Sequence, residues 1–162
     1  DKNFRRPLVK GRISSEFGYR THPVTGKKNK FHSGTDIAGN SEGTKVYSVA
    51  KGTVCKLTKK SSCGGNMVYI QHMVNGKKYT STYMHLLTIN VKIGDVVTSE
   101  TVIGTVGGGK STKYDNCSTG PHLHLSLATG WYEKDYTSYS SWRARLVNAR
   151  TYMNLPSKWT AR

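Results

Sequence analysis

Short stretches of alternating apolar and polar residues, separated by turn-forming residues, dominate the chain. The side chains of a half-buried β-strand alternate in this way, because successive residues point to opposite faces of a sheet. Asn75 followed by Gly76 is a strong hairpin-turn signal, and residues 59–66 have the composition of a second hairpin loop. The strands predicted from this pattern cover residues 46–50, 52–57, 67–72, 78–85, 102–106 and 122–127.

Helices are predicted only near the C-terminal end. Trp142, Leu146 and Val147 have roughly helical spacing within residues 140–148, and one further turn is expected near residues 151–152. Residues 107–121 are rich in Gly, Ser, Thr and Asn, which is typical of a long exposed loop. The sequence contains no internal repeat, linker or change of composition. We therefore expect one mostly antiparallel β domain over residues 1–162, a size at which roughly two thirds of the unfolded surface is buried on folding.

The distribution of apolar residues also bears on targeting. No run approaches the roughly 18 apolar residues of a membrane-spanning helix, so we expect no transmembrane segment. The first seven residues lack the apolar centre of a signal peptide. We expect a mature or trimmed N-terminus from which any export signal has already been removed.

The net charge is strongly positive and is spread over the whole chain. Twenty-five Lys and Arg against nine Asp and Glu give +16 at pH 7. Such a field attracts polyanions, whether nucleic acid, an anionic membrane or an anionic cell-wall polymer. Three lysine pairs are candidate contacts, although any one of them alone is an ordinary solvated hairpin tip: residues 27–28, 59–60 and 77–78.

Cys55, Cys63 and Cys117 form no CxxC pair, which argues against a structural zinc finger. Cys55 and Cys63 are near enough in sequence to be bridged across a hairpin, whereas Cys63 and Cys117 both lie in predicted loops. In an exported protein we expect one disulfide and one free thiol, and the sequence leaves the pairing open.

His32 and Asp36 form the first candidate metal-binding pair. Ser-Gly-Thr between them disfavours a helix, which excludes the helical HExxH zinc motif. Four residues apart on a strand, an imidazole and a carboxylate share one face and supply two of the three protein ligands that a catalytic zinc ion needs. Gly34 would allow the backbone or a substrate to approach closely. Taken alone, such a pair is more often a simple His–Asp contact on a turn.

His122 and His124 form the second candidate pair. They flank Leu123, so both imidazoles project from one face of a strand while Leu123 points into the core. Together with His32 and Asp36, this strand completes a set of two histidines and one aspartate. The spacing leaves open whether His122 or His124 would bind the metal.

Three further histidines remain. His85 ends a predicted strand after Tyr83 and Met84, where it is either a partly buried residue at a turn or a proton shuttle beside the metal. His22 lies in a loop, where a structural role and a substrate contact are equally expected. His72 closes a strand and is expected to be structural.

Five motifs now stand in one order along the chain: FGYRTHP at residues 17–23, HSGTD at 32–36, GTV at 52–54, YMHL at 83–86 and TGPHLH at 119–124. Together they resemble the M23 (LytM/lysostaphin-type) family of zinc peptidoglycan endopeptidases, over residues from about 6 to 127. The resemblance implies a mainly β, antiparallel, two-sheet, sandwich-like fold, with few short helices and an open groove that holds the zinc site.

Carried over position by position, the resemblance makes His32, Asp36 and His124 the ligands of one zinc ion per chain. It makes His85 and His122 the catalytic histidines, one as general acid and base and the other as stabiliser of the oxyanion. These roles agree with zinc chemistry, in which the metal activates a water molecule and polarises the scissile carbonyl. Which of His85 and His122 is the general base stays open.

The implied substrate is the peptide part of peptidoglycan, in a cross-bridge or a stem peptide. We expect an exported, bacteriolytic, monomeric enzyme that acts at the cell wall or is carried on a phage particle. The +16 charge would hold it to anionic wall polymers. Two alternatives are a degenerate, non-catalytic wall-binding module and a nucleic-acid-binding β domain. The complete motif set argues against the first, and no nucleic-acid-binding motif supports the second.

Two regions depart from the family pattern. Residues 107–118 are longer than the usual loop before the HxH strand and contain Cys117. Residues 131–162 are more aromatic and basic than the motifs require. Both regions are expected to border the groove, where they would affect substrate preference rather than metal chemistry.

Overall fold

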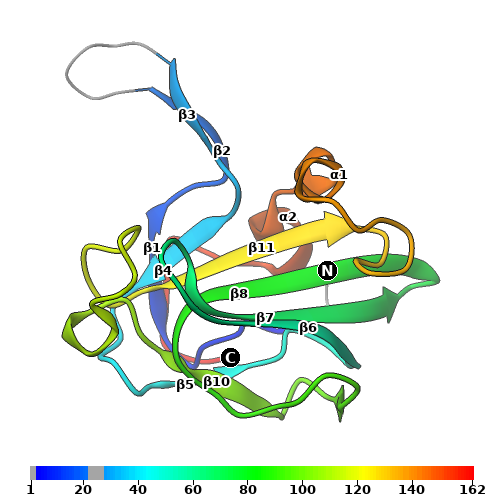
Figure 1. Ribbon diagram of the computed structural model, residues 1–162, viewed down its shortest axis with the longest axis horizontal. Helices are drawn as coiled ribbons and strands as arrows, with labels where there is room; N and C mark the ends of the chain where they lie inside the picture. Colours follow the sequence, from blue (N-terminus) through cyan, green and yellow to red (C-terminus); the bar gives the residue numbers. More distant parts are fainter. Residues whose placement is uncertain (1–2, 22–27) are drawn as a thin grey trace.

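Antiparallel strands make up most of the computed structural model, which describes residues 3–21 and 28–162 (Figure 1). The strands are β1 (Gly11–Ser15), β2 (Gly18–Thr21), β3 (Lys28–His32), β4 (Thr35–Ala38), β5 (Lys45–Tyr47), β6 (Gly52–Ser61), β7 (Gly65–Val74), β8 (Lys77–Ile89), β9 (Val96–Val97), β10 (Val102–Val106), β11 (Leu123–Thr129), β12 (Leu146–Val147) and β13 (Lys158–Trp159). The helices are η1 (Lys110–Thr112), a 3₁₀ helix, and the α-helices α1 (Tyr139–Ala144) and α2 (Ala149–Met153).

Within the described residues, eleven strands form one sheet and two form a separate ribbon. The main path of the sheet is β13-β1-β4-β11-β8-β7-β6-β9, with β10 joining β8 to β5 and β12 added to β11. The ribbon of β2 and β3 projects from the body of the molecule (Figure 1). This arrangement confirms the predicted mainly antiparallel β fold with few short helices.

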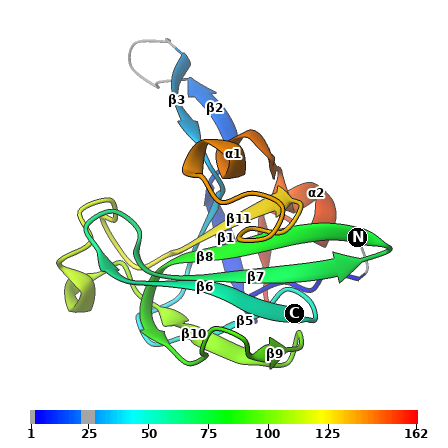
Figure 2. The same cartoon turned by 45° about the vertical axis from the view of Figure 1, so that its right-hand side comes forward.

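Strand β8 connects the two layers of this fold. Its first part pairs with β7 and β11, and its end, from Leu86 to Ile89, pairs with β10. His85 lies between the two parts with a φ of 63°, in the left-handed region that few non-glycine residues adopt. The end of β8 forms one layer with β10 and β5. This layer lies below the layer that β6, β7 and the first part of β8 form (Figure 2). The bend at His85 therefore helps to divide one continuous sheet into two layers.

Alternation along β11 separates the core from the site. Leu123, Leu125 and Leu127 are fully buried in the main hydrophobic cluster. His124 lies between two of these leucines and points to the opposite face, as the period of two requires. The prediction that Leu123 points inward and the histidines outward is confirmed.

The C-terminal segment contributes to both hydrophobic clusters, and Ala149 and Met153 of α2 belong to the main one. Trp142 of α1 packs with Tyr69, Tyr132 and Tyr136 in a second hydrophobic cluster. The predicted helix over 140–148 was too long, because α1 ends at Ala144 and β12 then pairs with the free edge of β11. The predicted turn at 151–152 lies within α2. No helix in the described part of the chain is long and apolar enough to span a membrane.

The predicted loop before β11 is tied down at two places. Gly107 and His122 form an isolated β-bridge at its base. A disulfide between Cys63 and Cys117 joins the loop to the turn between β6 and β7, and Cys55 is free. The expected count of one disulfide and one free thiol is confirmed, and the structure selects the long-range pairing.

His72 is part of the folded core, as expected. Its side chain is almost fully buried, its Nδ1 donates to the backbone oxygen of Lys51 over 2.8 Å, and its Nε2 lies 2.7 Å from the hydroxyl of Ser81. Burial lowers the pKa of His72 from 6.5 to about 4, against a smaller opposing effect of the Lys51 contact. The folded protein therefore holds this imidazole neutral over a range in which the unfolded chain protonates it.

This difference predicts an acid-sensitive fold. The contribution of His72 is fully present above pH 6.5 and is lost as the pH falls toward 4, by roughly 3 kcal/mol. Urea unfolding of the wild type and of His72→Gln at pH 7, 5.5 and 4 measures it. We expect the variant to be less stable at pH 7 and to lose less stability on acidification. Equal slopes for the two proteins would contradict this origin of the acid sensitivity.

Candidate metal centre

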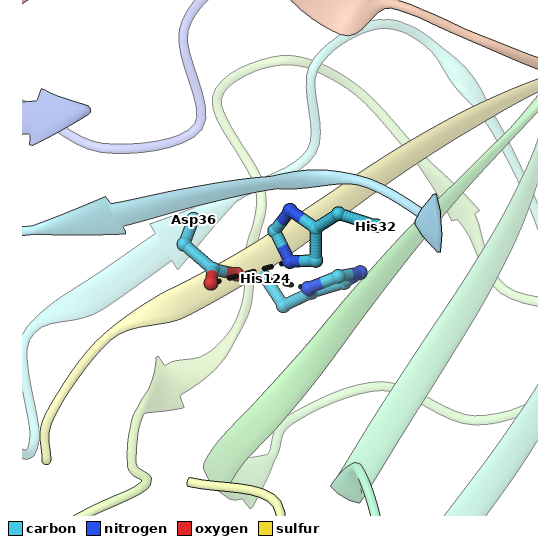
Figure 3. Close-up of side chains that lie close together, drawn as sticks. All are labelled: His32, Asp36 and His124. Carbon is cyan, nitrogen blue, oxygen red and sulfur yellow. Dashed lines mark hydrogen bonds and ion pairs between the residues drawn. The ribbon is translucent and has the colours of Figure 1, made fainter. Parts of the chain in front are cut away.

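Three donor side chains from three strands converge on one point. His32 ends β3, Asp36 belongs to β4 and His124 belongs to β11. One donor atom from each lies within 4.8 Å of the other two (Figure 3). Residues from both candidate pairs thus meet in space, and of His122 and His124 it is His124 that joins the cluster.

Strand pairing brings Asp36 and His124 together. They are direct partners in the antiparallel pairing of β4 with β11, and His124 Nδ1 lies 2.9 Å from Asp36 Oδ1. His32 reaches the same point from the end of β3, with its Nε2 3.3 Å from Asp36 Oδ2. Ligands of a tetrahedral zinc ion, each about 2.0–2.2 Å from the metal, lie roughly 3.3–3.6 Å apart. The donor set therefore fits zinc, and the 3.3 Å separation lies in this range, whereas the 2.9 Å separation is a hydrogen-bonding distance that has to lengthen when a metal replaces the proton.

Gly34 allows this convergence. A Cβ atom at this position would lie 2.4 Å from the backbone oxygen of Leu125 and 2.7 Å from Nε2 of His124. The sequence predicted that the backbone or a substrate approaches Gly34 closely. In the structure it is the backbone of β11 that does so.

Partners outside the cluster orient both imidazoles. His32 Nδ1 lies 2.9 Å from the backbone oxygen of Glu16, which can only accept, so Nδ1 donates and Nε2 is left with a lone pair. His124 Nε2 lies 3.2 Å from the hydroxyl of Ser33. Because a hydroxyl both donates and accepts, Ser33 can pair with His124 whether its Nδ1 carries a proton or binds a metal.

The local electrostatics keep these groups in metal-binding form. Burial lowers the pKa of His124, and contact with Asp36 opposes this only in part. Burial by itself raises the pKa of Asp36, but the interactions with His124 and His32 outweigh it and hold the pKa well below the usual range. At neutral pH His124 is thus a neutral imidazole and Asp36 an ionised carboxylate, the forms that bind zinc.

His85 and His122 lie beside the three donors. Their ring centroids are 4.5 Å apart, and that of His85 is 6.0 Å from that of His124. His122 Nε2 lies 3.7 Å from Asp36 Oδ1, and its Nδ1 donates to the backbone oxygen of Gly120 over 2.9 Å. All five residues named from the sequence therefore lie in one place, whereas His22 lies outside the described residues.

These side chains form part of the wall of a groove of about 670 Å³. Its lining includes polar side chains, namely the histidines, Ser33 and Thr119, as well as apolar and aromatic ones. The apolar and aromatic lining residues are Met67, Tyr69, Met84, Tyr139 and Trp142. Two of these belong to α1, so the C-terminal region borders the groove, as expected from the sequence.

The family model for Peptidase family M23 matches residues 30–136. The chain belongs to peptidase family M23. The peptidoglycan DD-endopeptidase ShyC of Vibrio cholerae is 37% identical over 132 residues, which cover 81% of this chain and 28% of that protein. Lysostaphin of Staphylococcus staphylolyticus is 35% identical over 109 residues, which cover 67% of this chain and 21% of that protein. The chain spans less than a third of the length of the curated relatives that it matches.

Solved M23 structures share the fold. A zinc-containing peptidase from Vibrio cholerae is 32% identical with a TM-score of 0.65, over 91% of this chain and 39% of that one. The catalytic domain of lysostaphin from Staphylococcus simulans is 24% identical with a TM-score of 0.63, over 91% of this chain and 93% of that one. The second match confirms the M23 fold class, since it covers nearly all of both chains.

One buried side chain of this M23 site was absent from the sequence analysis. Asp115 lies in the loop before β11, and its carboxylate is in hydrogen-bonding contact with Nδ1 of His85. An aspartate in a polar loop matches no motif. The sequence offers one indication, which is that Asp115 lies two residues before Cys117. This indicates a place near the site only when the pairing of Cys117 with Cys63 is known.

The close contact of Gly34 with β11 gives a test of the metal centre. In Gly34→Ala the new methyl group forces β4 and β11 apart, so we expect zinc affinity to fall by about 10- to 100-fold, as for other changes in the groups that support ligands. Zinc titration with a competing chelator dye measures this. Gly120→Ala is the matched control, because a Cβ there meets nothing within 4 Å. Wild-type zinc affinity in Gly34→Ala would show that the approach of the two strands does not position the ligands.

Proposed function

We propose that this chain is a zinc-dependent endopeptidase that hydrolyses peptide bonds of bacterial peptidoglycan, and that residues 1–162 form a single M23 catalytic domain. The observation that carries the proposal is the convergence of His32, Asp36 and His124 within one groove that also contains His85 and His122. Membership of family M23 supports the same reaction, as do relatives named as peptidoglycan DD-endopeptidases and as metalloproteases.

In this proposal His32 Nε2, the Asp36 carboxylate and His124 Nδ1 hold one zinc ion. When bound, zinc supplies Lewis acidity, which polarises a carbonyl oxygen and makes water a better nucleophile at neutral pH. The ligand side chains are only 8–19% exposed, so the groove removes bulk water from the reacting groups while leaving them open to a substrate.

His85 and His122 supply the proton transfers. One imidazole accepts a proton from the attacking water and passes it to the leaving amine, while the other donates to the oxygen on which negative charge develops. The 4.5 Å separation of their ring centroids allows both to reach one scissile bond.

The substrate is proposed to be a peptide cross-link of the wall. The relatives ShyA and ShyC are named as DD-endopeptidases, so a D,D-peptide cross-link is the first substrate to test. The Cys63–Cys117 disulfide supports secretion into an oxidising compartment, where peptidoglycan lies. Bacteriolytic action is proposed on the likeness to lysostaphin, whose solved structure is described as an antimicrobial peptidase.

The +16 charge supports retention of a monomer on anionic wall polymers. The candidate lysines differ in how free they are for this role. Lys59 and Lys60 are exposed at the end of β6. Lys78 instead lies 4.6 Å from the ring of Trp131 and 3.5 Å from Asp135, so it is partly committed to the fold. Residue 27 and the side chain of residue 28 lie outside the described part of the structure.

Digestion of purified peptidoglycan with and without a zinc chelator tests the proposal. We expect new peptide termini, identified by mass spectrometry, that disappear with chelator and return with added zinc. His124→Ala is expected to lose both zinc and activity, whereas His85→Ala is expected to keep zinc and lose turnover, by about 100-fold or more. Chelator-resistant release, or full activity in either variant, would contradict the proposal.

The alternative of a degenerate, non-catalytic module predicts a different result. Such a module would bind peptidoglycan without releasing peptides, whether or not zinc is present. The convergence of all five histidine and aspartate side chains does not favour it.

A further inference from the structure

The carboxylate of Asp115 is buried against the catalytic groove. Its side chain has no exposed surface, and that of His85 is only 6% exposed. Asp115 Oδ2 accepts a hydrogen bond from His85 Nδ1. Burying a charged carboxylate costs desolvation free energy, which hydrogen-bond donors around it have to offset. The donors around Asp115 therefore indicate its role.

Backbone donors occupy the other oxygen of Asp115. Oδ1 accepts from the N–H of Gly64 over 3.2 Å and from the N–H of Cys117 over 3.1 Å. These contacts fix the orientation of the carboxylate and leave Oδ2 for the imidazole. A Cβ atom at Gly65 would lie 2.8 Å from Oδ2, so the glycine in the adjacent turn leaves the space that the carboxylate occupies.

The same turn fixes the backbone of His85. The N–H of His85 donates to the oxygen of Gly64 over 2.7 Å, and its oxygen accepts from Gly107 over 2.9 Å. The Cys63–Cys117 disulfide joins this turn to the loop that carries Asp115. Backbone, carboxylate and disulfide therefore hold one imidazole in one orientation.

We propose that Asp115 is a positioning residue that holds His85 with its proton on Nδ1, so that Nε2 is a proton acceptor in the groove. An ionised carboxylate only accepts hydrogen bonds, so the ring nitrogen that faces it must carry the proton. This tautomer makes His85 the general base of the proposed reaction, and that assignment of the base rests on the proposed function.

The proton balance of the reaction follows from this tautomer. As the water oxygen bonds to the carbonyl carbon, its proton moves to His85 Nε2, and the carboxylate of Asp115 stabilises the imidazolium. The same proton then moves to the amide nitrogen as the C–N bond breaks, and His85 is neutral again. The Nδ1 atom of His122 faces neutral groups instead, the backbone oxygen of Gly120 over 2.9 Å and the hydroxyl of Ser118 over 3.2 Å, and these stabilise an imidazolium less than a carboxylate does.

Asp115→Asn separates positioning from structure. In this variant the amide oxygen of the new side chain can accept from the same two backbone N–H groups, which places its NH₂ group against His85 Nδ1. That ring nitrogen must then accept, and the proton moves to Nε2. We expect kcat to fall by about 100-fold or more, with KM changed by less than about threefold and zinc content unchanged.

Asp115→Ala and Asp95→Asn complete the set. If Asp115 only held its loop, Asp115→Asn would be nearly as active as the wild type and only Asp115→Ala would be impaired. If Asp115 positions His85, Asp115→Asn and Asp115→Ala both lose turnover. Asp95→Asn is the matched control, because Asp95 also accepts a backbone N–H, from Lys92 over 2.8 Å, but lies outside the groove lining.

The tautomer itself is read by ¹⁵N NMR of the imidazole rings, assigned with His85→Gln. In the wild type we expect the neutral His85 ring to carry its proton on Nδ1, and in Asp115→Asn on Nε2. This readout needs no turnover, so it stands even if no peptidoglycan is hydrolysed and the proposed function fails.

Each of four results would overturn the inference. They are a wild-type ring protonated on Nε2, a ring in Asp115→Asn that keeps its proton on Nδ1, wild-type kcat in Asp115→Asn, and loss of zinc or of cooperative folding in that variant. The last result would assign Asp115 to structure alone.

Discussion

The antiparallel pairing of β4 with β11 is the constraint on which the site depends. It sets Asp36 beside His124 on one face of the sheet while Ile37 and Leu123, which are also paired, enter the core from the other. A slip of one residue would exchange these faces, placing a carboxylate in the hydrophobic core and an isoleucine in the groove. Core packing therefore enforces the geometry of the metal ligands, and the close approach at Gly34 leaves this register little freedom.

Burial and carboxylates together set the chemistry of the histidines. Burial lowers the pKa of His85 and His124, which favours the neutral imidazole that can bind a metal or accept a proton. Asp36 and Asp115 each oppose that effect in part and, by accepting hydrogen bonds, orient one ring. The chain has only nine acidic residues against 25 basic ones, and it places these two inside the site while its surface is strongly cationic.

Local patterns in the sequence predicted the strands and the residues of the site. The alternation around Leu123 predicted which side chains of β11 face the core. The resemblance to family M23 predicted the site residues from motifs alone. Those residues are His32, Asp36, His85, His122 and His124. The prediction of the strands is confirmed because a strand's period of two is local. The roles of the five site residues stay predictions, and the structure adds that their side chains lie close together.

Features that depend on long-range packing could not be predicted in the same way. Leu146 and Val147 have helical spacing with Trp142, yet they form β12 because β11 offers a free edge there. Asp115 matches no motif, and its contact with His85 exists only once the loop before β11 is joined to the turn between β6 and β7. The left-handed backbone of His85 likewise follows from the bend of β8 between two layers rather than from local preference.

The central claim is that one zinc ion is bound by side chains from β3, β4 and β11. Diffraction data collected at the zinc absorption edge from crystals grown with zinc test it most directly. The account predicts one anomalous peak per chain, about 2.0–2.2 Å from His32 Nε2, the Asp36 carboxylate and His124 Nδ1. A peak bound by His122 or His85 in place of His124, or no peak in this groove at saturating zinc, would contradict it.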